Sequence, residues 1–351
     1  MAIFCTKNTQ IVGISACVPK QATSNHNYAH IPAKERELLI KTTGIESRRV
    51  ATGEQCTSDM CFEAARTLLK SALWSPESID VLIWVSQSPD YHLPATSIIL
   101  QDKLGLPKTS LAFDINLGCS GYVYGLSVMA NMLQGGQLKR GLLLVGDKST
   151  SGTSYQDKST YPLFGDAGTA TLLEYSESAA PMFFNLQSDG SGKNAIIIPD
   201  GGMRNPLSDD SFVVKEYEGG LVRHRKHLWL DGLEVFNFSL REVAPNVNAL
   251  LSHLGHDIDN YDYFVFHQAN KLMNESIRKK LRLPPEKVPY TLPKFGNTSS
   301  ASIPLTMVCE LSGALSAGKH RLLLSAFGVG LSWGSASVET KHLICPLLIE
   351  I

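Results

Sequence analysis

The sequence contains no apolar run of the length that a membrane-spanning helix needs, about 20 residues. Its first residues, MAIFCTKNTQIVGISACVP, lack the charged segment and the long apolar segment of a secretion signal. The two absences favour a soluble, cytoplasmic protein with no membrane partner.

The sequence has no excess of positive or negative charge. It contains 32 Lys and Arg residues and 33 Asp and Glu residues, so its net charge is −1. Proteins that bind nucleic acid through their overall field carry a clear positive excess. We therefore expect no nucleic-acid partner, and any basic binding surface has to be local.

The cysteines lack the spacing of a metal site or a disulfide framework. The seven are odd in number, scattered, and form no CxxC pair; they stand at positions 5, 17, 56, 61, 119, 309 and 345. This usage is typical of a reducing compartment and predicts no metal site.

Apolar runs of strand length alternate with helical patterns in the first half of the chain. The runs are IVGISACVP, VLIWVS, LAFDIN, LLLVGD and TATLLEY, and a helix is expected over 60–73. The alternation predicts an α/β fold with a largely parallel sheet. A chain of 351 residues that is 43% hydrophobic can bury a core of this size.

The second half repeats this order of elements. YFVFHQAN corresponds to VLIWVS, RLLLSAFG to GLLLVGDK, and LSWGSASVE to TATLLEY. We therefore predict two similar halves, 1–178 and 179–351, joined near 176–182. The segment 187–230 is rich in Gly, Asp, Ser and Asn and predicts long loops, which either cover a binding site or form a plain surface excursion.

Cys119 follows the run LAFDIN and precedes apolar residues at helical spacing, so it lies where a strand leads into a helix. Free N–H groups and the helix dipole at such a junction favour a thiolate. The alternative is a buried, inert cysteine.

Two polar residues occupy corresponding places in the second half. His267 ends an apolar run before a helix, and Asn297 lies in a turn before another helix. With Cys119 they form a set capable of covalent acyl chemistry. Papain-like proteases use the same order of residues, but their motif C-G-[SA]-C-[WY] is absent from the sequence around GCSGY.

Six stretches resemble the β-ketoacyl-acyl-carrier-protein synthase III family of thiolase-fold condensing enzymes. They are KTTGIESRRVA, DINLGCSGYVYGL, LFGDAGTATLL, VFHQAN, FGNTSSASIPL and AFGVGLSWGSA, and they occur in the family's order. The resemblance implies a five-layered αβαβα fold built from two pseudo-duplicated halves, and a homodimer.

The resemblance also implies a reaction. Cys119 would carry an acyl group from a coenzyme A or phosphopantetheine thioester, with its oxyanion bound by the backbone N–H groups of Cys119 and Val329. His267 and Asn297 would stabilise the enolate formed when a malonyl-acyl-carrier-protein loses CO₂. The product would be a 3-oxoacyl thioester, and no metal or redox cofactor is required.

Substrate contacts implied by the resemblance involve Asn270 of HQAN and Phe327 beside the cysteine. A tryptophan that holds the coenzyme A adenine in other members is missing near Leu38, and Lys158 replaces the arginine that those members place on the opposite side of the nucleotide. Leu93 stands where the partner subunit of short-chain members contributes a phenylalanine, so we expect a longer or branched acyl group.

An acidic carrier protein is expected to contact the helix after HQAN, through Lys271, Arg278 and Lys279, with Lys280 and Arg282 nearby. Leu272 stands where many relatives carry an arginine. The alternative is a basic run that complements the helix C-terminus. Two other functions stay open: acyl transfer or thioester hydrolysis through Cys119, and a non-catalytic subunit of a heteromeric synthase.

Overall fold

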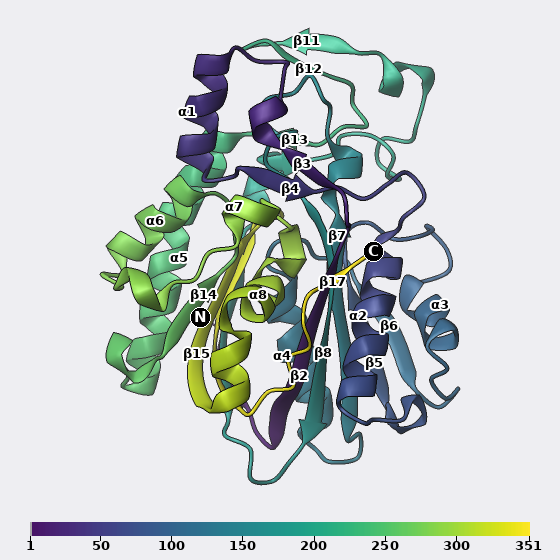
Figure 1. Ribbon diagram of the computed structural model, residues 1–351, viewed down its shortest axis with the longest axis vertical. Coiled ribbons are helices and arrows are strands. Elements are labelled where there is room, and N and C mark those ends of the chain that lie inside the picture. Colours follow the sequence, from purple (N-terminus) through teal and green to yellow (C-terminus); the bar gives the residue numbers. More distant parts are fainter. Residues whose placement is uncertain (1) are drawn as a thin grey trace.

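The computed structural model describes residues 2–351, whose core contains two β-sheets (Figure 1). The first sheet has the strand order β17 (Ile349–Glu350), β2 (Thr9–Val18), β8 (Asp166–Tyr175), β7 (Arg140–Lys148), β5 (Val81–Val85) and β6 (Leu111–Ile115). The second has the order β1 (Ala2–Thr6), β9 (Met182–Ser188), β16 (Ser332–Lys341), β15 (Lys319–Gly328) and β14 (Tyr263–Phe266).

Both sheets are mixed, so the prediction of a largely parallel sheet holds only in part: three of the five strand pairs of the first sheet are parallel, including β17 with β2. In the first sheet β7, β5 and β6 run parallel, but β8 is antiparallel to both of its neighbours. In the second sheet only β14 and β15 run parallel. β7 and β8 in the first half, and β15 and β16 in the second, follow one another without an α-helix between them, and an antiparallel pair needs no helical crossover.

Helices form three layers around the two sheets, as Figure 1 shows. The middle layer, between the sheets, contains α4 (Gly121–Leu133) and α8 (Ser302–Ala317). The outer face of the first sheet is covered by α2 (Thr57–Ser71) and α3 (Thr96–Lys103). The outer face of the second sheet is covered by α5 (Gly232–Leu254) and α6 (Lys271–Lys280). The result is a five-layered αβαβα fold of two similar halves, as the resemblance implies.

The middle layer is apolar because it is covered on both sides. Buried side chains of α4 and α8 share one core cluster with both sheets, and a helix that is apolar all round is a buried helix. Gly125 lets α4 approach β5, since a Cβ at this position would lie 2.8 Å from Val85. The close approach packs α4, the helix that follows Cys119, against β5.

The correspondence between the halves extends to strand order. β2, β8, β7 and β5 are neighbours in one sheet, and β9, β16, β15 and β14 are neighbours in the other. The terminal strands are exchanged, because β1 joins the second sheet and β17 joins the first. β8 ends at Tyr175 and β9 begins at Met182, and the predicted boundary after residue 178 lies in this connection.

Smaller elements gather at one end of the molecule (Figure 1). They comprise α1 (Ala33–Thr43), α7 (Leu292–Phe295) and three two-stranded pairs: β3 (Ala22–Ser24) with β4 (Ser47–Arg49), β10 (Ile196–Ile197) with β13 (Trp229–Leu230), and β11 (Lys215–Tyr217) with β12 (Leu221–Arg223). The last two pairs belong to the excursion 187–230. A buried ion pair between Arg223 and Asp157, 3.1 Å apart, attaches this excursion to the first half.

The helices of residues 2–351 include none that is both long enough and apolar enough for a membrane span.

Candidate active site

A cavity of about 810 Å³ lies where strands of both halves end. Its walls include Cys119, His267 and Asn297, which the sequence analysis selected as the reactive set. The excursion 187–230 also lines it, through 196–198, 200–202, Lys226, Leu228 and Leu230. The predicted loops therefore help to form a binding cavity in addition to covering the surface.

Cys119 lies at the predicted junction, between the end of β6 at Ile115 and the start of α4 at Gly121. The residue is buried, with 9% of its surface exposed. Backbone N–H groups of Val329 and of Cys119 itself contact the thiol, and Ser299 Oγ lies 3.9 Å from its Sγ. The two N–H groups predicted to bind an acyl oxyanion thus both lie beside the nucleophile.

The thiol of Cys119 is protonated at neutral pH, contrary to the expected thiolate. Burial raises its pKa to about 11, and the hydrogen bonds from the backbone of Val329 and Cys119 offset only part of that effect. The helix end supplies favourable N–H groups, but desolvation of the charged form outweighs them. Attack on a thioester therefore requires that the proton leaves Cys119 as the substrate binds.

His267 follows β14 and is almost fully buried, with 1% exposed. Its Nδ1 lies 2.7 Å from Ser302 Oγ, and its ring packs edge-on against Phe327 with centroids 5.5 Å apart. Burial lowers the pKa of His267 to about 3, against a smaller opposite effect from the backbone of Ser299. The imidazole is therefore neutral, and its Nε2 can donate a hydrogen bond when Nδ1 accepts from Ser302.

Asn297 is held by the turn between α7 and α8. Its Oδ1 accepts the backbone N–H of Ser299 at 2.9 Å, which orients the amide. Within residues 2–351 its Nδ2 has no hydrogen-bond acceptor, and Asn297 lines the cavity. The amide N–H₂ is thus free to donate to a substrate oxygen.

Ser299 connects the three selected residues, and the sequence analysis missed it. It contacts the Cys119 thiol, fixes the amide of Asn297 and meets the ring of His267 through its backbone. Its φ of +50° is rare for a residue other than glycine, asparagine or aspartate. The sequence showed only a Ser/Thr-rich turn, in which no single serine stood out.

Asp147, at the end of β7, is a second residue that the sequence analysis missed. Its carboxylate is 3% exposed and accepts four hydrogen bonds: from Ser86 Oγ at 3.1 Å, Gln87 N at 2.8 Å, and Ser300 N and Oγ at 3.2 and 2.6 Å. Burial raises the pKa of Asp147, while the hydrogen bonds from Ser300 and Gln87 oppose that shift. Asp147 thereby holds the turn of the second half against the first half.

Asp147→Asn should change the titration of Cys119, because the negative charge of Asp147 raises the pKa of that thiol. We expect the pH at which iodoacetamide alkylates Cys119 to move downward. The new amide presents an N–H₂ to a backbone donor, and an unsatisfied buried donor costs about 1–3 kcal/mol of stability, so the melting temperature should also fall. Asp102→Asn, on the exposed face of α3, is the control; an unmoved alkylation profile would refute this role.

The structure places three of the four predicted substrate contacts in the cavity wall: Lys158, Asn270 and Phe327. Asn270 also begins α6, where its Oδ1 accepts the Met273 N–H at 2.8 Å. Leu93 is absent from this wall and 86% exposed, so within a single chain it contacts no substrate in the cavity. A role for Leu93 in a partner's cavity stays a prediction.

The predicted carrier contacts divide into two groups. Lys271 is exposed and adjoins the cavity-lining residue Asn270, whereas Lys279 lies about 12 Å further along α6 at 1.5 Å per residue. Arg278 is bound to Glu275 by a bidentate ion pair and donates to the Leu283 carbonyl at 2.6 Å. Because its side chain is only 13% exposed and already paired with Glu275, Arg278 is poorly placed to contact a carrier protein.

Groups of three or more His, Cys, Asp or Glu side chains that could hold a metal ion do not occur within residues 2–351. The expectation that the chemistry needs no metal stays a prediction.

Comparisons with known proteins agree with this geometry. A family model described as 3-oxoacyl-[acyl-carrier-protein (ACP)] synthase III matches residues 113–190. A second model, described as the C-terminal part of the same family, matches residues 251–340. The β-ketoacyl-[acyl-carrier-protein] synthase III of Streptococcus mutans is 32% identical over 324 residues, covering 92% of this chain and 96% of the relative. That of Syntrophomonas wolfei is 33% identical over 328 residues, covering 93% of this chain and 95% of the relative.

A solved structure extends the similarity to three dimensions. The crystal structure of 3-oxoacyl-(acyl-carrier protein) synthase from Burkholderia xenovorans LB400 has a TM-score of 0.93 and 40% sequence identity, with 99% of each chain covered. The chain therefore belongs to the β-ketoacyl-[acyl-carrier-protein] synthase III family of thiolase-fold acyltransferases.

Proposed function

We propose that this acyltransferase joins an acyl group, carried on Cys119, to a malonyl group on an acyl carrier protein. One observation carries the proposal: a buried cysteine shares a cavity with the neutral imidazole of His267 and the free amide of Asn297. The cysteine can hold the acyl group, and the other two can donate to one carbonyl oxygen.

The first half of the reaction forms the acyl-enzyme. The sulfur of Cys119 attacks the donor thioester carbonyl, and the developing oxyanion lies near the N–H groups of Cys119 and Val329. The carbon–sulfur bond of the donor then breaks. The donor leaves as a thiol and takes up the proton that Cys119 has lost.

The second half forms the carbon–carbon bond. The carboxylate of the malonyl group leaves as CO₂, and its bonding electrons form an enolate on the thioester oxygen. His267 and Asn297 donate hydrogen bonds to that oxygen, which are strongest when it is charged. The enolate carbon attacks the acyl-Cys119 carbonyl, the carbon–sulfur bond breaks, and the released thiolate takes up a proton from solvent, as its pKa of about 11 favours.

Simple acyl transfer or thioester hydrolysis is the other candidate reaction. It requires the nucleophile and an oxyanion site but no second site for an enolate. The family membership and the intact His267 and Asn297 therefore favour condensation. A non-catalytic subunit is likewise not favoured, because such a chain has no need to retain these groups in one cavity.

The experiment that distinguishes these reactions measures CO₂ and the product together. The protein is incubated with an acyl thioester and malonyl-carrier labelled in the free carboxyl group. Condensation predicts equal amounts of labelled CO₂ and 3-oxoacyl-carrier. Free fatty acid or acyl-carrier formed without CO₂ would instead establish hydrolysis or transfer.

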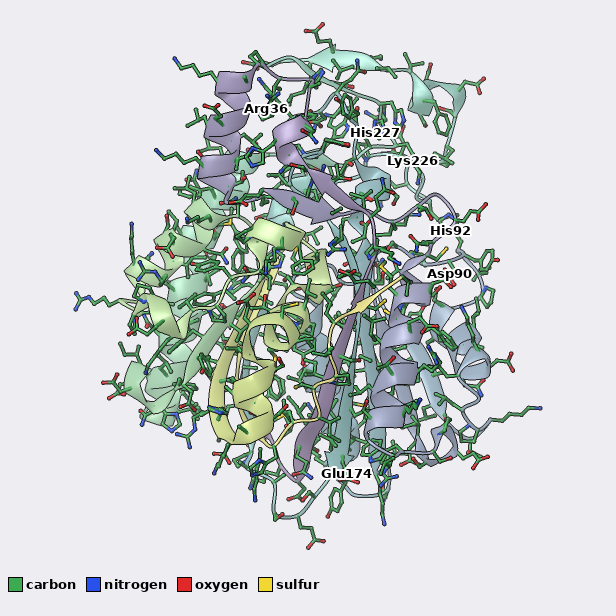
Figure 2. All side chains as sticks on the ribbon, viewed as in Figure 1. Arg36, Asp90, His92, Glu174, Lys226 and His227 are labelled. Atoms are coloured by element: carbon green, nitrogen blue, oxygen red, sulfur yellow. The ribbon has the colours of Figure 1, made fainter. Side chains whose placement is uncertain are left out.

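The proposal includes a homodimer formed through the edge of the first sheet. β6 is the last strand of that sheet and has no neighbour on its outer side within residues 2–351. Exposed apolar residues accompany this edge: Leu111 in β6, Ile98 in α3, and Tyr91 and Leu93 in the loop before α3. An unpaired strand edge with apolar neighbours supports pairing with a second copy. Figure 2 labels Asp90 and His92 in the loop that carries Leu93, on the side of α3.

The proposal also includes a carrier-docking role for Lys271. Lys271→Glu should raise the apparent KM for malonyl-carrier about threefold to tenfold, because it reverses one charge facing an acidic partner. The KM for malonyl-pantetheine, which lacks the carrier, should change little. Lys70→Glu, an exposed lysine of α2, serves as the charge-matched control. Equal KM values for malonyl-carrier in both variants would contradict docking at Lys271.

A cytoplasmic location belongs to the same proposal and is supported by the scattered cysteines, which are unpaired.

A further inference from the structure

Within residues 2–351, Arg48 is a buried cation that forms no ion pair with a carboxylate. It lies in β4 with 1% of its surface exposed, and burial lowers its pKa from the usual value, although arginine stays protonated in proteins. Asp166 favours the charged form, but its carboxylate accepts hydrogen bonds from Ala51 and Thr150 instead. A buried charge without an ion pair weakens a fold, so stability alone does not account for Arg48.

The guanidinium of Arg48 donates hydrogen bonds to neutral oxygens. Its Nε lies 3.2 Å from Asn25 Oδ1, and its Nη1 lies 2.9 Å from the carbonyl oxygen of Phe164. Asn25, which is fully buried, in turn donates from Nδ2 to the carbonyl of Pro162 at 2.8 Å. Arg48 and Asn25 therefore hold two carbonyls of the segment 162–165, which reaches the cavity wall at Phe164.

The other side of the segment 162–165 holds the backbone of Asn297. The Asn297 N–H donates to the Leu163 carbonyl at 2.9 Å, and the Gly165 N–H donates to the Asn297 carbonyl at 3.0 Å. Phe164 and Asn297 thereby form a parallel bridge. A single stretch of backbone thus separates the guanidinium from the residue whose amide faces the cavity.

The turn that precedes Asn297 also lies directly against Arg48. Gly296 has a φ of +65°, and an added Cβ would lie 2.9 Å from Arg48 Cγ and 2.6 Å from the Leu163 carbonyl oxygen. Figure 1 shows β4 beside α7, the helix that ends immediately before Gly296. A displacement of Arg48 is therefore passed to Asn297 both through the segment 162–165 and through this turn.

We infer that Arg48 is a positioning residue for the side-chain amide of Asn297, acting through the segment 162–165 and the turn before Asn297. The inference rests on the proposed function, because it assigns Arg48 to the step in which this amide donates to the enolate oxygen. The contacts of Arg48 lead to Asn297 and not to Cys119. We therefore expect condensation to depend on Arg48 and acylation to be independent of it.

Arginine suits this role because its planar guanidinium presents several donors in fixed directions. One guanidinium thereby meets the amide oxygen of Asn25 and the carbonyl of Phe164 together. A lysine ammonium at the end of a flexible stem cannot hold both oxygens in the same geometry, and a methionine offers no donor at all.

The test measures both half-reactions in Arg48→Lys and Arg48→Met. We expect kcat for condensation to fall about threefold to tenfold in Arg48→Lys and about tenfold to a hundredfold in Arg48→Met, because a misplaced reacting group can cost about a hundredfold. The rate of Cys119 acylation should stay within about twofold of the wild type, and KM for malonyl-carrier should change less than kcat. Replacing a buried charge with an apolar side chain of similar volume is often neutral for stability, so Arg48→Met should fold, which its melting temperature checks.

Combining Arg48→Met with Asn297→Ala gives a readout that a purely structural role would not move. If Arg48 acts by placing the amide, Arg48→Met should lower condensation about twofold or less in the Asn297→Ala background, because effects that pass through one shared contact are not additive. A general loss of packing would instead lower the rate by the same factor in both backgrounds.

Arg140→Met is the matched control. Arg140 stacks on the ring of Trp74, with Cζ 4.2 Å from the centroid, an arrangement that Arg48 shares with a tyrosine ring at 4.7 Å. Arg140 pairs with Glu174 at 3.3 Å, and Figure 2 shows Glu174 at the end of the molecule opposite to Lys226 of the cavity wall. Both half-reactions of Arg140→Met should keep the wild-type rate, even where its melting temperature falls.

The results separate this inference from the proposed function. Equal losses of acylation and condensation in a folded Arg48→Met protein would overturn the inference, and so would equal factors in the wild-type and Asn297→Ala backgrounds. Either result leaves condensation by the wild type intact. A wild type that acylates Cys119 but forms no 3-oxoacyl product would contradict the proposed function itself.

Discussion

His267→Ala is expected to lower the rate of condensation about a hundredfold to a thousandfold, the usual cost of removing one donor to a developing oxyanion. Acylation of Cys119 should persist, because the N–H groups beside the thiol belong to Val329 and Cys119. Asn297→Ala should likewise slow condensation and leave acylation of Cys119 in place. The measurement is single-turnover kinetics, with the acylation and the CO₂ release followed separately.

The neutral state of His267 gives this prediction a pH signature. Since its pKa is about 3, the imidazole does not titrate between pH 5 and 9, and condensation should show no histidine step in that interval. His253→Ala, an exposed histidine of α5, is the control. Because His267 packs against Phe327, melting temperatures are measured for both variants. Equal losses of acylation and condensation in folded His267→Ala and Asn297→Ala would contradict their role at the enolate.

Gly328→Ala is expected to abolish acylation of Cys119 to below about one hundredth of the wild-type rate, since a misplaced reacting group can cost about a hundredfold. Gly328 ends β15 with a φ of +157°, and an added Cβ would lie 2.5 Å from the Cys119 Cβ and 2.8 Å from its Sγ. Either Cys119 moves away or the turn that carries the Val329 N–H moves, and both changes separate the thiol from its oxyanion donor.

Gly313→Ala provides the matched control, because Gly313 lies in α8 and an added Cβ meets no atom within 4 Å. Overpacking a buried site costs about 1–3 kcal/mol, so Gly328→Ala should remain folded and show a lowered melting temperature. Iodoacetamide labelling checks whether the thiol is still accessible. A Gly328→Ala protein that acylates at the wild-type rate would show that the close contact between these residues does not position the nucleophile.

The element order of this fold follows from the sequence, but the strand directions do not. Buried runs such as VLIWVS coincide with β5, and the repeated order of elements gives the two halves. Apolar runs do not record direction, however, and the antiparallel pairing of β8 with β7 depends on a connection without an α-helix. The exchange of β1 into the second sheet likewise depends on long-range pairing with β9, which no local pattern of residues encodes.

The reactive set was predictable because each member stands at a local transition from strand or turn to helix. The charge states were not, since they depend on burial. The thiolate expected for Cys119 is overturned by desolvation, which raises its pKa to about 11. Arg278 looked like a free surface cation in the sequence, yet its pairing with Glu275 appears only when α6 is seen packed.

Asp147 shows why supporting residues escape a reading of the sequence. An aspartate that ends a strand is usually a surface residue, and GLLLVGDK gives no reason to place it in the core. Its partner Ser300 lies 153 residues away, in the other half. Only the packing of the two halves brings the two together beneath the cavity.

The central claim is that Cys119 carries an acyl group that condensation then consumes. The most direct test is intact-protein mass spectrometry of the wild type and Cys119→Ala, after incubation with a panel of acyl-CoA and acyl-carrier thioesters and then after addition of malonyl-carrier. The account predicts an acyl mass gain on the wild type alone, which disappears as 3-oxoacyl-carrier forms. A mass gain that survives in Cys119→Ala, or one that is lost only as free acid, would contradict it.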